Sequence, residues 1–184
     1  MVSENISFRE TTSQDARAIR HVHEKAFGQK DEAELTIALL QDPTSQPLVS
    51  LLALRGSEPI GHILFSRVYL EGVGPSPLAH ILAPLAVVPT WQGKGVGSQL
   101  SREGLGRIRA MGSVLCLVLG HPDYYRRLGF IPDAASQGLE APYPISDKHA
   151  DAWMANWLTP DRSAHWTGRI RCADALNKKM YWQE

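Results

Sequence analysis

Two almost wholly apolar runs, residues 79–88 and 114–119, enclose a glycine-rich turn and a segment of helical length. Within that segment, residues 95–111, apolar side chains recur at the spacing of an amphipathic helix, at Val96, Leu100 and Ile108. Such apolar runs are typical of strands buried on both faces, and a strand, helix and strand in this order usually form a right-handed parallel crossover. The unit therefore predicts a mixed α/β domain.

The residues before this unit predict further elements of the same domain. Residues 6–9, 48–55 and 60–70 have strand patterns, and the last two stand in hairpin order. Residues 16–27 and 31–41 have apolar side chains at helical spacing. We expect two helices and three strands ahead of the crossover.

The C-terminal part is less clearly patterned. Pro122 and Gly129 bracket one short helix, since proline favours the first helical position and glycine the position after the end. Residues 166–172 alternate weakly like a strand, and Trp153 and Trp157 are spaced by one helical turn. The tryptophans of this part, Trp166 and Trp182 included, either pack in the core, which is favoured, or form an aromatic acceptor pocket or a dimer face.

Composition narrows the class of protein. The 184 residues suit a single domain, 1–184, and 19 basic residues balance 19 acidic ones, so nothing indicates a nucleic-acid or membrane partner. No apolar run reaches the ~18–20 residues of a membrane helix, and the start MVSENISFRETT has no leader pattern. We expect a cytoplasmic protein. Cys116 and Cys172 lack CxxC spacing, which predicts buried thiols and no metal site.

The glycine-rich turn, VVPTWQGKGVGSQL at residues 87–100, carries the chain from a buried strand into a helix. A helix N-terminus presents unpaired N–H groups and partial positive charge, and glycines let an anion approach them. Lys94 and Ser98 add a charge and a hydroxyl. The turn therefore predicts a phosphate site, although positive backbone φ angles and close packing alone would also explain the glycines.

Two common phosphate motifs do not fit this turn. The pattern GxxxxGK[ST] is absent because Gly95 follows Lys94, and GxGxxG fails because Ser98 stands where its last glycine belongs. The acid that accompanies the dinucleotide motif is also missing after the next strand, near Leu119. Nucleoside triphosphates and nicotinamide dinucleotides are therefore not the expected ligands.

The run from Val87 to Gly97 closely resembles the Q/R-x-x-G-x-G/A pyrophosphate loop of the GNAT superfamily of N-acetyltransferases. Gln92 opens it, and Gly95 and Gly97 are its two small positions. The segment YRRLGF, residues 125–130, is similar to the family's Y-x-x-x-G-F segment. GHILFS, LAPLAVVP and LGHPDYYRRLGF look most like the bacterial predicted acetyltransferases called YhbS-like. The resemblance covers residues 6–131, and residues 132–184 would complete the sheet and the acceptor side.

This resemblance implies a fold and a co-substrate. The fold is an α/β (α+β) domain with a twisted, mostly antiparallel mixed sheet, a splayed parallel strand pair, and helices on both faces. Acetyl-CoA would lie in the splay, its pantetheine pairing with the main chain of Leu85, Ala86, Val87 and Val88. Its diphosphate would accept hydrogen bonds from the N–H groups of Gln92, Gly93, Lys94, Gly95, Val96, Gly97 and Ser98.

The resemblance also assigns catalytic roles. Tyr125 matches the tyrosine that protonates the leaving thiolate. An N–H at Ala86 or Val87 would stabilise the oxyanion. Tyr124 either packs or lines the cofactor cleft, and Arg127, like Arg126, either approaches the phosphates or is solvated.

No residue is singled out as the base that takes a proton from the amine. His62, His80, His121, Asp123 and Glu24 are candidates, each more readily explained as structural or exposed. Water and backbone carbonyls often serve instead in this family.

The expected function is acetyl transfer from acetyl-CoA to a primary amine of a small molecule or peptide. Attack would be direct, through a tetrahedral intermediate, with Cys116 buried and inert. The acidic residues Asp31, Glu32 and Glu34 could attract an amine. The alternative is a non-catalytic acyl-CoA-binding module, and the chain would be a monomer or a homodimer.

Overall fold

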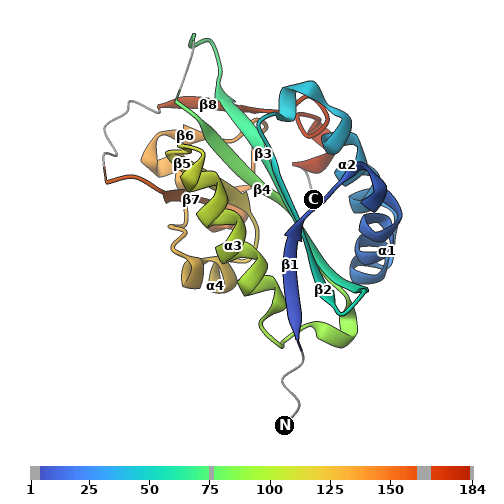
Figure 1. Cartoon of the computed structure of the whole chain (residues 1–184). Helices are drawn as coiled ribbons and strands as arrows, with labels where there is room; N and C mark the ends of the chain where they lie inside the picture. Colours follow the sequence, from blue (N-terminus) through green and yellow to red (C-terminus); the bar gives the residue numbers. More distant parts are fainter. Residues whose placement is uncertain (1–4, 75–76, 161–166, 183–184) are drawn as a thin grey trace.

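The computed structural model describes residues 5–74, 77–160 and 167–182. Its centre is a single twisted sheet with the main order β1-β2-β3-β4-β5-β7, beside which β8 pairs with β3 and β6 (Figure 1). Along the main path every pair is antiparallel except β4–β5, and the short β6–β8 pair is parallel too. The strands are β1 (Ile6–Glu10), β2 (Val49–Arg55), β3 (Glu58–Leu70), β4 (Ala79–Val87), β5 (Leu115–Leu119), β6 (Leu139–Glu140), β7 (Trp153–Trp157) and β8 (Gly168–Cys172).

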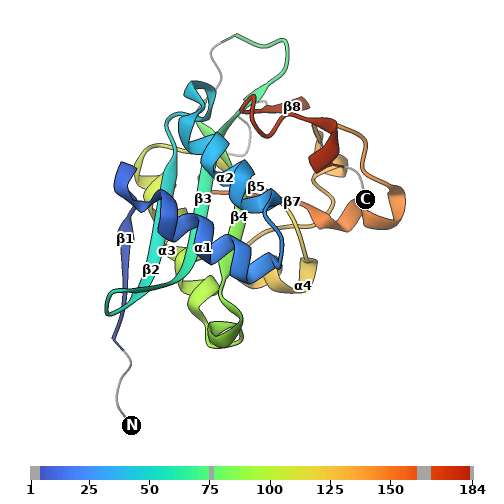
Figure 2. The same ribbon diagram turned by 90° about the vertical axis from the view of Figure 1, so that its right-hand side faces the viewer.

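Helices cover both faces of this sheet. Helices α1 (Ala16–Phe27) and α2 (Asp31–Gln41) lie on one face, and α3 (Val96–Ala110) lies on the other (Figures 1 and 2). The short α4 (Pro122–Tyr125) follows β5 and continues as a 3-10 turn, Arg126–Leu128. The expected fold class is confirmed, and the expected helices and strands before residue 130 agree with the observed ones to within about two residues.

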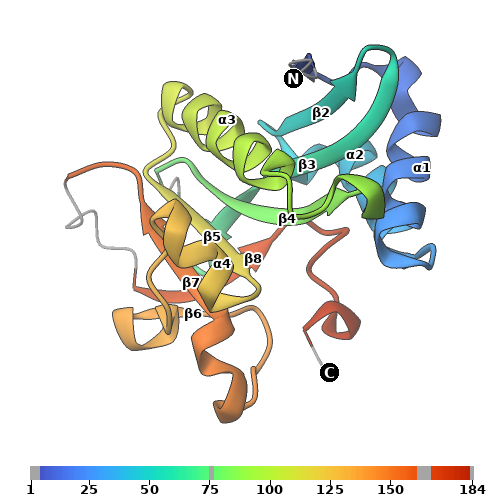
Figure 3. The ribbon, with the colours of Figure 1, turned by 90° about the horizontal axis from the view of Figure 1, so that it is seen from below.

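The parallel pair β4–β5 is splayed. The two strands are paired only at three positions, Ala79 with Leu115, His80 with Cys116, and Ile81 with Leu117. Beyond Ile81, β4 stays paired with β3 as far as Val87, while β5 runs away from it (Figure 3). The N-terminal end of α3 and the Tyr124–Tyr125 part of α4 border the opening between the two strands.

Helix α3 packs closely on the sheet through a small residue. Gly104 is buried, and a Cβ atom there would lie 2.0 Å from the Phe65 ring. Leu100 and Ile108 on the same face are fully buried. This contact fixes the position of α3, and with it the position of the glycine-rich turn.

The C-terminal part differs from the sequence-based expectation. Trp153 and Trp157 lie on strand β7, paired with Leu119 and Leu115, and not on a helix. Residues four apart share a face in a strand as well as in a helix, so their spacing could not distinguish the two. Trp153 is buried and packs edge-on against Trp182, with ring centroids 5.6 Å apart. Both belong to the core, while Trp166 lies outside the described residues.

In the described part of the chain, no helix is both long and apolar enough to span a bilayer.

Candidate active site

A cavity of about 690 Å³ opens where β4 and β5 separate. The end of β4, the glycine-rich turn, the first turn of α3 and the helix α4 surround it. Eleven of the fourteen predicted site residues line it. The lining residues are Leu85, Val87, Trp91, Gln92, Gly93, Gly95, Val96, Gly97, Ser98, His121, Tyr124, Tyr125 and Arg127.

The glycine-rich turn leaves backbone donors at the edge of this cavity. Gly93 and Gly95 have left-handed φ angles of +73° and +84°, and a Cβ atom at either position would meet nothing within 4 Å. Gly95 caps α3 without any side-chain cap, and the amide of Gln99 is the first to bond back, to the Gly95 carbonyl at 3.0 Å. The amides of Val96, Gly97 and Ser98 therefore have no acceptor within the helix. The corner therefore has the partial positive charge and the open geometry that favour an anion.

Gln92 and Lys94, two of the seven predicted residues of the turn, make contacts within the protein that differ from those of the other five. The Gln92 amide donates to the Pro89 carbonyl at 3.3 Å, and its side chain donates to the Val87 carbonyl at 2.9 Å. Gln92 thus ties the turn to the end of β4. Lys94 does not line the cavity, and its ammonium lies over the Trp91 ring, 4.6 Å from the centroid. Trp91 lines the cavity, and no sequence pattern marked it as part of the site.

The four predicted residues on β4 divide into two pairs. Leu85 and Val87 line the cavity, whereas Ala86 and Val88 are buried away from it. The Val88 amide donates to the Ile60 carbonyl of β3 at 3.0 Å. Because amides alternate in direction along a strand, the Ala86 amide also faces β3, and those of Leu85 and Val87 face the opening. Of the two expected oxyanion donors, only Val87 is suitably oriented.

Tyr125 lines the cavity from α4. It packs edge-on against Tyr124 and Phe130, at centroid distances of 4.9 and 5.6 Å. Gly120 makes room for it, since a Cβ atom there would lie 2.4 Å from the Tyr125 ring. Burial, with Tyr124 and Cys116 nearby, raises the pKa of Tyr125 well above its usual range. The phenol is therefore protonated at neutral pH.

Tyr124 reaches across the cavity to the first turn of α3. Its hydroxyl is buried and has no hydrogen-bond partner among the described residues. A Cβ atom on Gly97 would lie 2.9 Å from that hydroxyl oxygen, so the glycine allows this close approach. Both tyrosines thus face the cavity, one at the helix terminus and one beside β5. Arg127 also lines it, and its Nε donates to the Asp123 carbonyl at 3.0 Å.

Two of the candidate bases, His62 and His80, are buried and form hydrogen bonds away from the cavity. In His62, Nδ1 lies 2.8 Å from Nε2 of His23, and Nε2 lies 2.8 Å from the Ser50 hydroxyl oxygen. In His80, Nδ1 lies 2.9 Å from the Ser113 hydroxyl oxygen, and Nε2 lies 2.8 Å from the Pro47 carbonyl oxygen. Burial lowers the pKa of His80 to about 4 and that of His62 well below its usual range. Neither lines the cavity. Of the five candidates only His121 does so, at the start of α4.

The cysteines lie inside the core. Cys116 and Cys172 are both buried, and burial raises the pKa of each thiol well above its usual range. Such thiols are poor nucleophiles because almost none of the thiolate forms at neutral pH. Among the described residues, no cluster of three or more His, Cys, Asp or Glu side chains is arranged to hold a metal ion.

Comparison with known proteins identifies the class. Residues 7–132 match the family model described as an acetyltransferase (GNAT) domain. The chain therefore belongs to the GNAT acetyltransferase family and is an acyltransferase, as the resemblance of its two motifs indicated.

Relatives and solved structures agree with this assignment. The chain is similar to the uncharacterized N-acetyltransferase YjhQ of Escherichia coli K12, at 47% identity over 95% of this chain and 96% of the relative. It is also similar to the structure of YhbS from Escherichia coli in complex with CoA, with a TM-score of 0.84, 26% identity, and coverage of 97% and 96%. A GNAT acetyltransferase from Brucella melitensis in complex with acetyl-CoA has a TM-score of 0.73, 29% identity, and coverage of 94% and 99%.

Proposed function

We propose that this chain transfers an acetyl group from acetyl-CoA to a primary amine of a small molecule or peptide. The observation that carries the proposal is a single cavity that holds both an uncapped glycine-lined helix terminus and a buried phenol. The first feature suits the diphosphate of coenzyme A, and the second suits its departing sulfur. Two similar structures contain CoA and acetyl-CoA, which supports the same ligand here.

Different residues of the cavity would bind different parts of acetyl-CoA. The amides from Gly93 to Ser98 would hold the diphosphate, and the outward amides of Leu85 and Val87 would face the pantetheine and the thioester. Arg127 stands at the same cavity and adds a positive charge. The buried hydroxyl of Tyr124 lacks a partner in the described chain, which a bound ligand at the α3 terminus would supply.

Two groups of the chain would stabilise charge during transfer. As the amine nitrogen bonds to the thioester carbon, the Val87 amide donates to the oxygen that becomes negative. As the carbon–sulfur bond breaks, Tyr125 donates its phenolic proton to the departing thiolate. The raised pKa of Tyr125 keeps the phenol protonated at neutral pH, and the phenolate left after the transfer regains a proton, directly or through water, from the nitrogen that becomes the amide. The amine loses its ammonium proton before attack to His121, which lines the cavity, or to water; the buried His62 and His80 do not line it.

Attack is direct, with no acyl-enzyme on the chain. Cys116 and Cys172 are fully buried thiols of raised pKa, and neither lines the cavity.

Replacing Tyr125 by Phe tests the proposal. We expect turnover, measured as CoA thiol release across a panel of amines, to fall by about 10²- to 10⁴-fold, the usual loss for a proton donor. Acetyl-CoA affinity, measured by calorimetry, should change little because the ring remains. Tyr69→Phe is the matched control, since that hydroxyl bonds to the Thr44 carbonyl at 2.9 Å, outside the cavity.

Two outcomes would contradict the proposal. Undiminished turnover in Tyr125→Phe would remove Tyr125 from the mechanism. Acetyl-CoA binding by the wild type with no thiol release on any amine would favour the non-catalytic acyl-CoA-binding module.

A further inference from the structure

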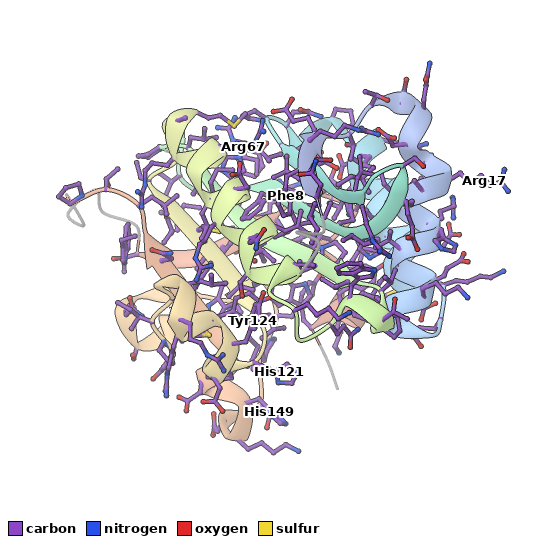
Figure 4. The ribbon with its side chains drawn as sticks, turned by 60° about the horizontal axis from the view of Figure 1, so that its bottom comes forward. Phe8, Arg17, Arg67, His121, Tyr124 and His149 are labelled. Atoms are coloured by element: carbon purple, nitrogen blue, oxygen red, sulfur yellow. The ribbon has the colours of Figure 1, made fainter. Side chains whose placement is uncertain are left out.

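A second cavity, of about 750 Å³, lies beside the first and shares His121 with it. Its walls come from the end of β5, from the segment 144–152, and from Tyr181 and Trp182 near the C-terminus. Figure 4 shows His121 between Tyr124 and His149. The two cavities therefore meet at the residue that precedes α4, the helix that carries Tyr125.

The polar lining of the second cavity is basic. It includes Lys148 together with His121 and His149, and it contains no Asp or Glu. Asp147 and Asp151 flank these residues on the 3-10 helix Asp147–Ala152 without lining the cavity. A Lys ammonium in a concave site attracts anions, and imidazole and hydroxyl groups can donate hydrogen bonds to them.

A third acid, Asp31 at the start of α2, acts on one lining residue, Tyr181. The pKa of Tyr181 is raised by burial and by the nearby Asp31 carboxylate, so Asp31 lies close to the tyrosine. Asp31 is also not among the lining residues. Asp31 thus places a negative charge near the Tyr181 end of the cavity, and Lys148 lines it from the segment 144–152.

The remaining lining is largely apolar. Leu119, Ile145 and Trp182 contribute to it, together with the proline rings of Pro122 and Pro144. Such a surface accommodates the hydrocarbon part of a ligand whose charged end needs a specific partner.

Building on the proposed function, we propose that the amine acceptor carries an anionic group, a carboxylate or a phosphate, that binds at Lys148 in the second cavity. Its amine then reaches past His121 to the acetyl end of the first cavity. Lys148 is a specificity-determining residue in this arrangement, because it contacts the part of the acceptor that does not react.

The test compares paired amines that differ in the anionic group. The carboxylate pair is δ-aminovalerate and its carboxamide, and the phosphate pair is phosphoethanolamine and ethanolamine. The measured quantity is the ratio of kcat/KM within each pair, for the wild type and for Lys148→Met. Intrinsic differences in amine reactivity cancel when the two enzymes are compared.

We expect the anion preference to fall by about three- to tenfold in Lys148→Met, for the carboxylate pair, the phosphate pair or both, as for one partly screened charge. Lys25→Met, an exposed lysine on α1, is the matched control and should leave the ratios unchanged. The pair that responds identifies the anion. Unchanged ratios in Lys148→Met would overturn the proposal while leaving acetyl transfer intact.

If none of these amines is acetylated, binding of the acetylated products decides. In the presence of CoA, calorimetry should find N-acetyl-δ-aminovalerate or N-acetyl-phosphoethanolamine bound more tightly than its neutral counterpart, and this difference should disappear in Lys148→Met. Equal affinities within both pairs would overturn the anionic acceptor. Failure of acetyl-CoA itself to bind would instead overturn the proposed function.

Discussion

At the scale of single residues, the three glycines of the turn have different tasks. Gly93 and Gly95 adopt left-handed φ angles that other residues rarely tolerate. Gly97 is helical, and its task is to leave space for the Tyr124 hydroxyl. The conformational explanation of the glycines is therefore compatible with the proposed ligand-binding one, because the same bare backbone leaves its amides open to the cavity.

Gly97→Ala should weaken acetyl-CoA binding by about tenfold. The added methyl group would lie 2.9 Å from the Tyr124 hydroxyl oxygen and displace that side chain within the cavity. Calorimetry with Gly97→Ala, with Tyr124→Phe and with the double variant measures the effect. Gly97→Ala should cost much less affinity in the Tyr124→Phe background than in the wild type, and purely additive losses would show that the two residues do not interact.

The sequence predicted which residues line the cavity better than it predicted the directions of their side chains and amides. The two motifs identified Tyr125 and the turn because backbone requirements at glycines leave a readable pattern. No sequence pattern showed that the Lys94 ammonium lies over the Trp91 ring, or that the Ala86 amide faces β3. Both orientations depend on neighbours that the fold brings together. Trp91 was missed because a buried aromatic residue has no sequence signature of its own.

At the scale of elements, helix α3 connects the central sheet to the glycine-rich turn that borders the cavity. Its N-terminus forms the proposed diphosphate site, and its buried face packs on β3 through Gly104 and Phe65. Changes in this packing should therefore affect stability, and the same helix offers an internal comparison in Gly106, which is exposed and surrounded by open space.

Gly104→Ala should destabilise the protein by about 1–3 kcal/mol, because the methyl group would overlap the Phe65 ring. Gly106→Ala should stabilise it by about 0.5–1 kcal/mol, since alanine is the better helix former and nothing lies within 4 Å. Urea unfolding measures both. If the two variants shift stability in the same direction, the close packing of α3 on β3 is not what determines the outcome.

The helices and strands that the sequence predicted well have a regular spacing of apolar residues or a residue that ends the element. Helix α1 ends at Gly28, whose φ is +70°, and residues 31–41 form α2 with the bounds expected. Strand β7 was missed because Trp153 and Trp157 share a face in either secondary structure. Its strand conformation comes from pairing with β5, a contact between segments far apart in the chain.

At the scale of the whole molecule, buried neutral histidines link stability to pH. Burial lowers the pKa of His23 and of His80 to about 4, and lowers that of His62 as well. The unfolded chain therefore binds protons below about pH 6.5 that the folded chain does not. The stability that these groups contribute is present above about pH 6.5 and is lost as the pH falls toward 4.

The free energy of unfolding should decrease by up to ~1.4 kcal/mol per pH unit for each such histidine between about pH 6.5 and 4. Urea titrations across this range measure the slope. In His80→Asn the slope should be shallower by about one proton. The lowered pKa of Asp15, which is paired with Arg9, acts only below this window. A stability that is constant down to about pH 4.5 would contradict this description of the core.

The most direct test of the account as a whole is a crystal structure of the chain with acetyl-CoA. We expect diphosphate oxygens within about 2.7–3.2 Å of backbone nitrogens between Gly93 and Ser98, and the thioester sulfur beside Tyr125. Acetyl-CoA bound outside the opening between β4 and β5, or held there with its diphosphate away from the first turn of α3, would contradict the account.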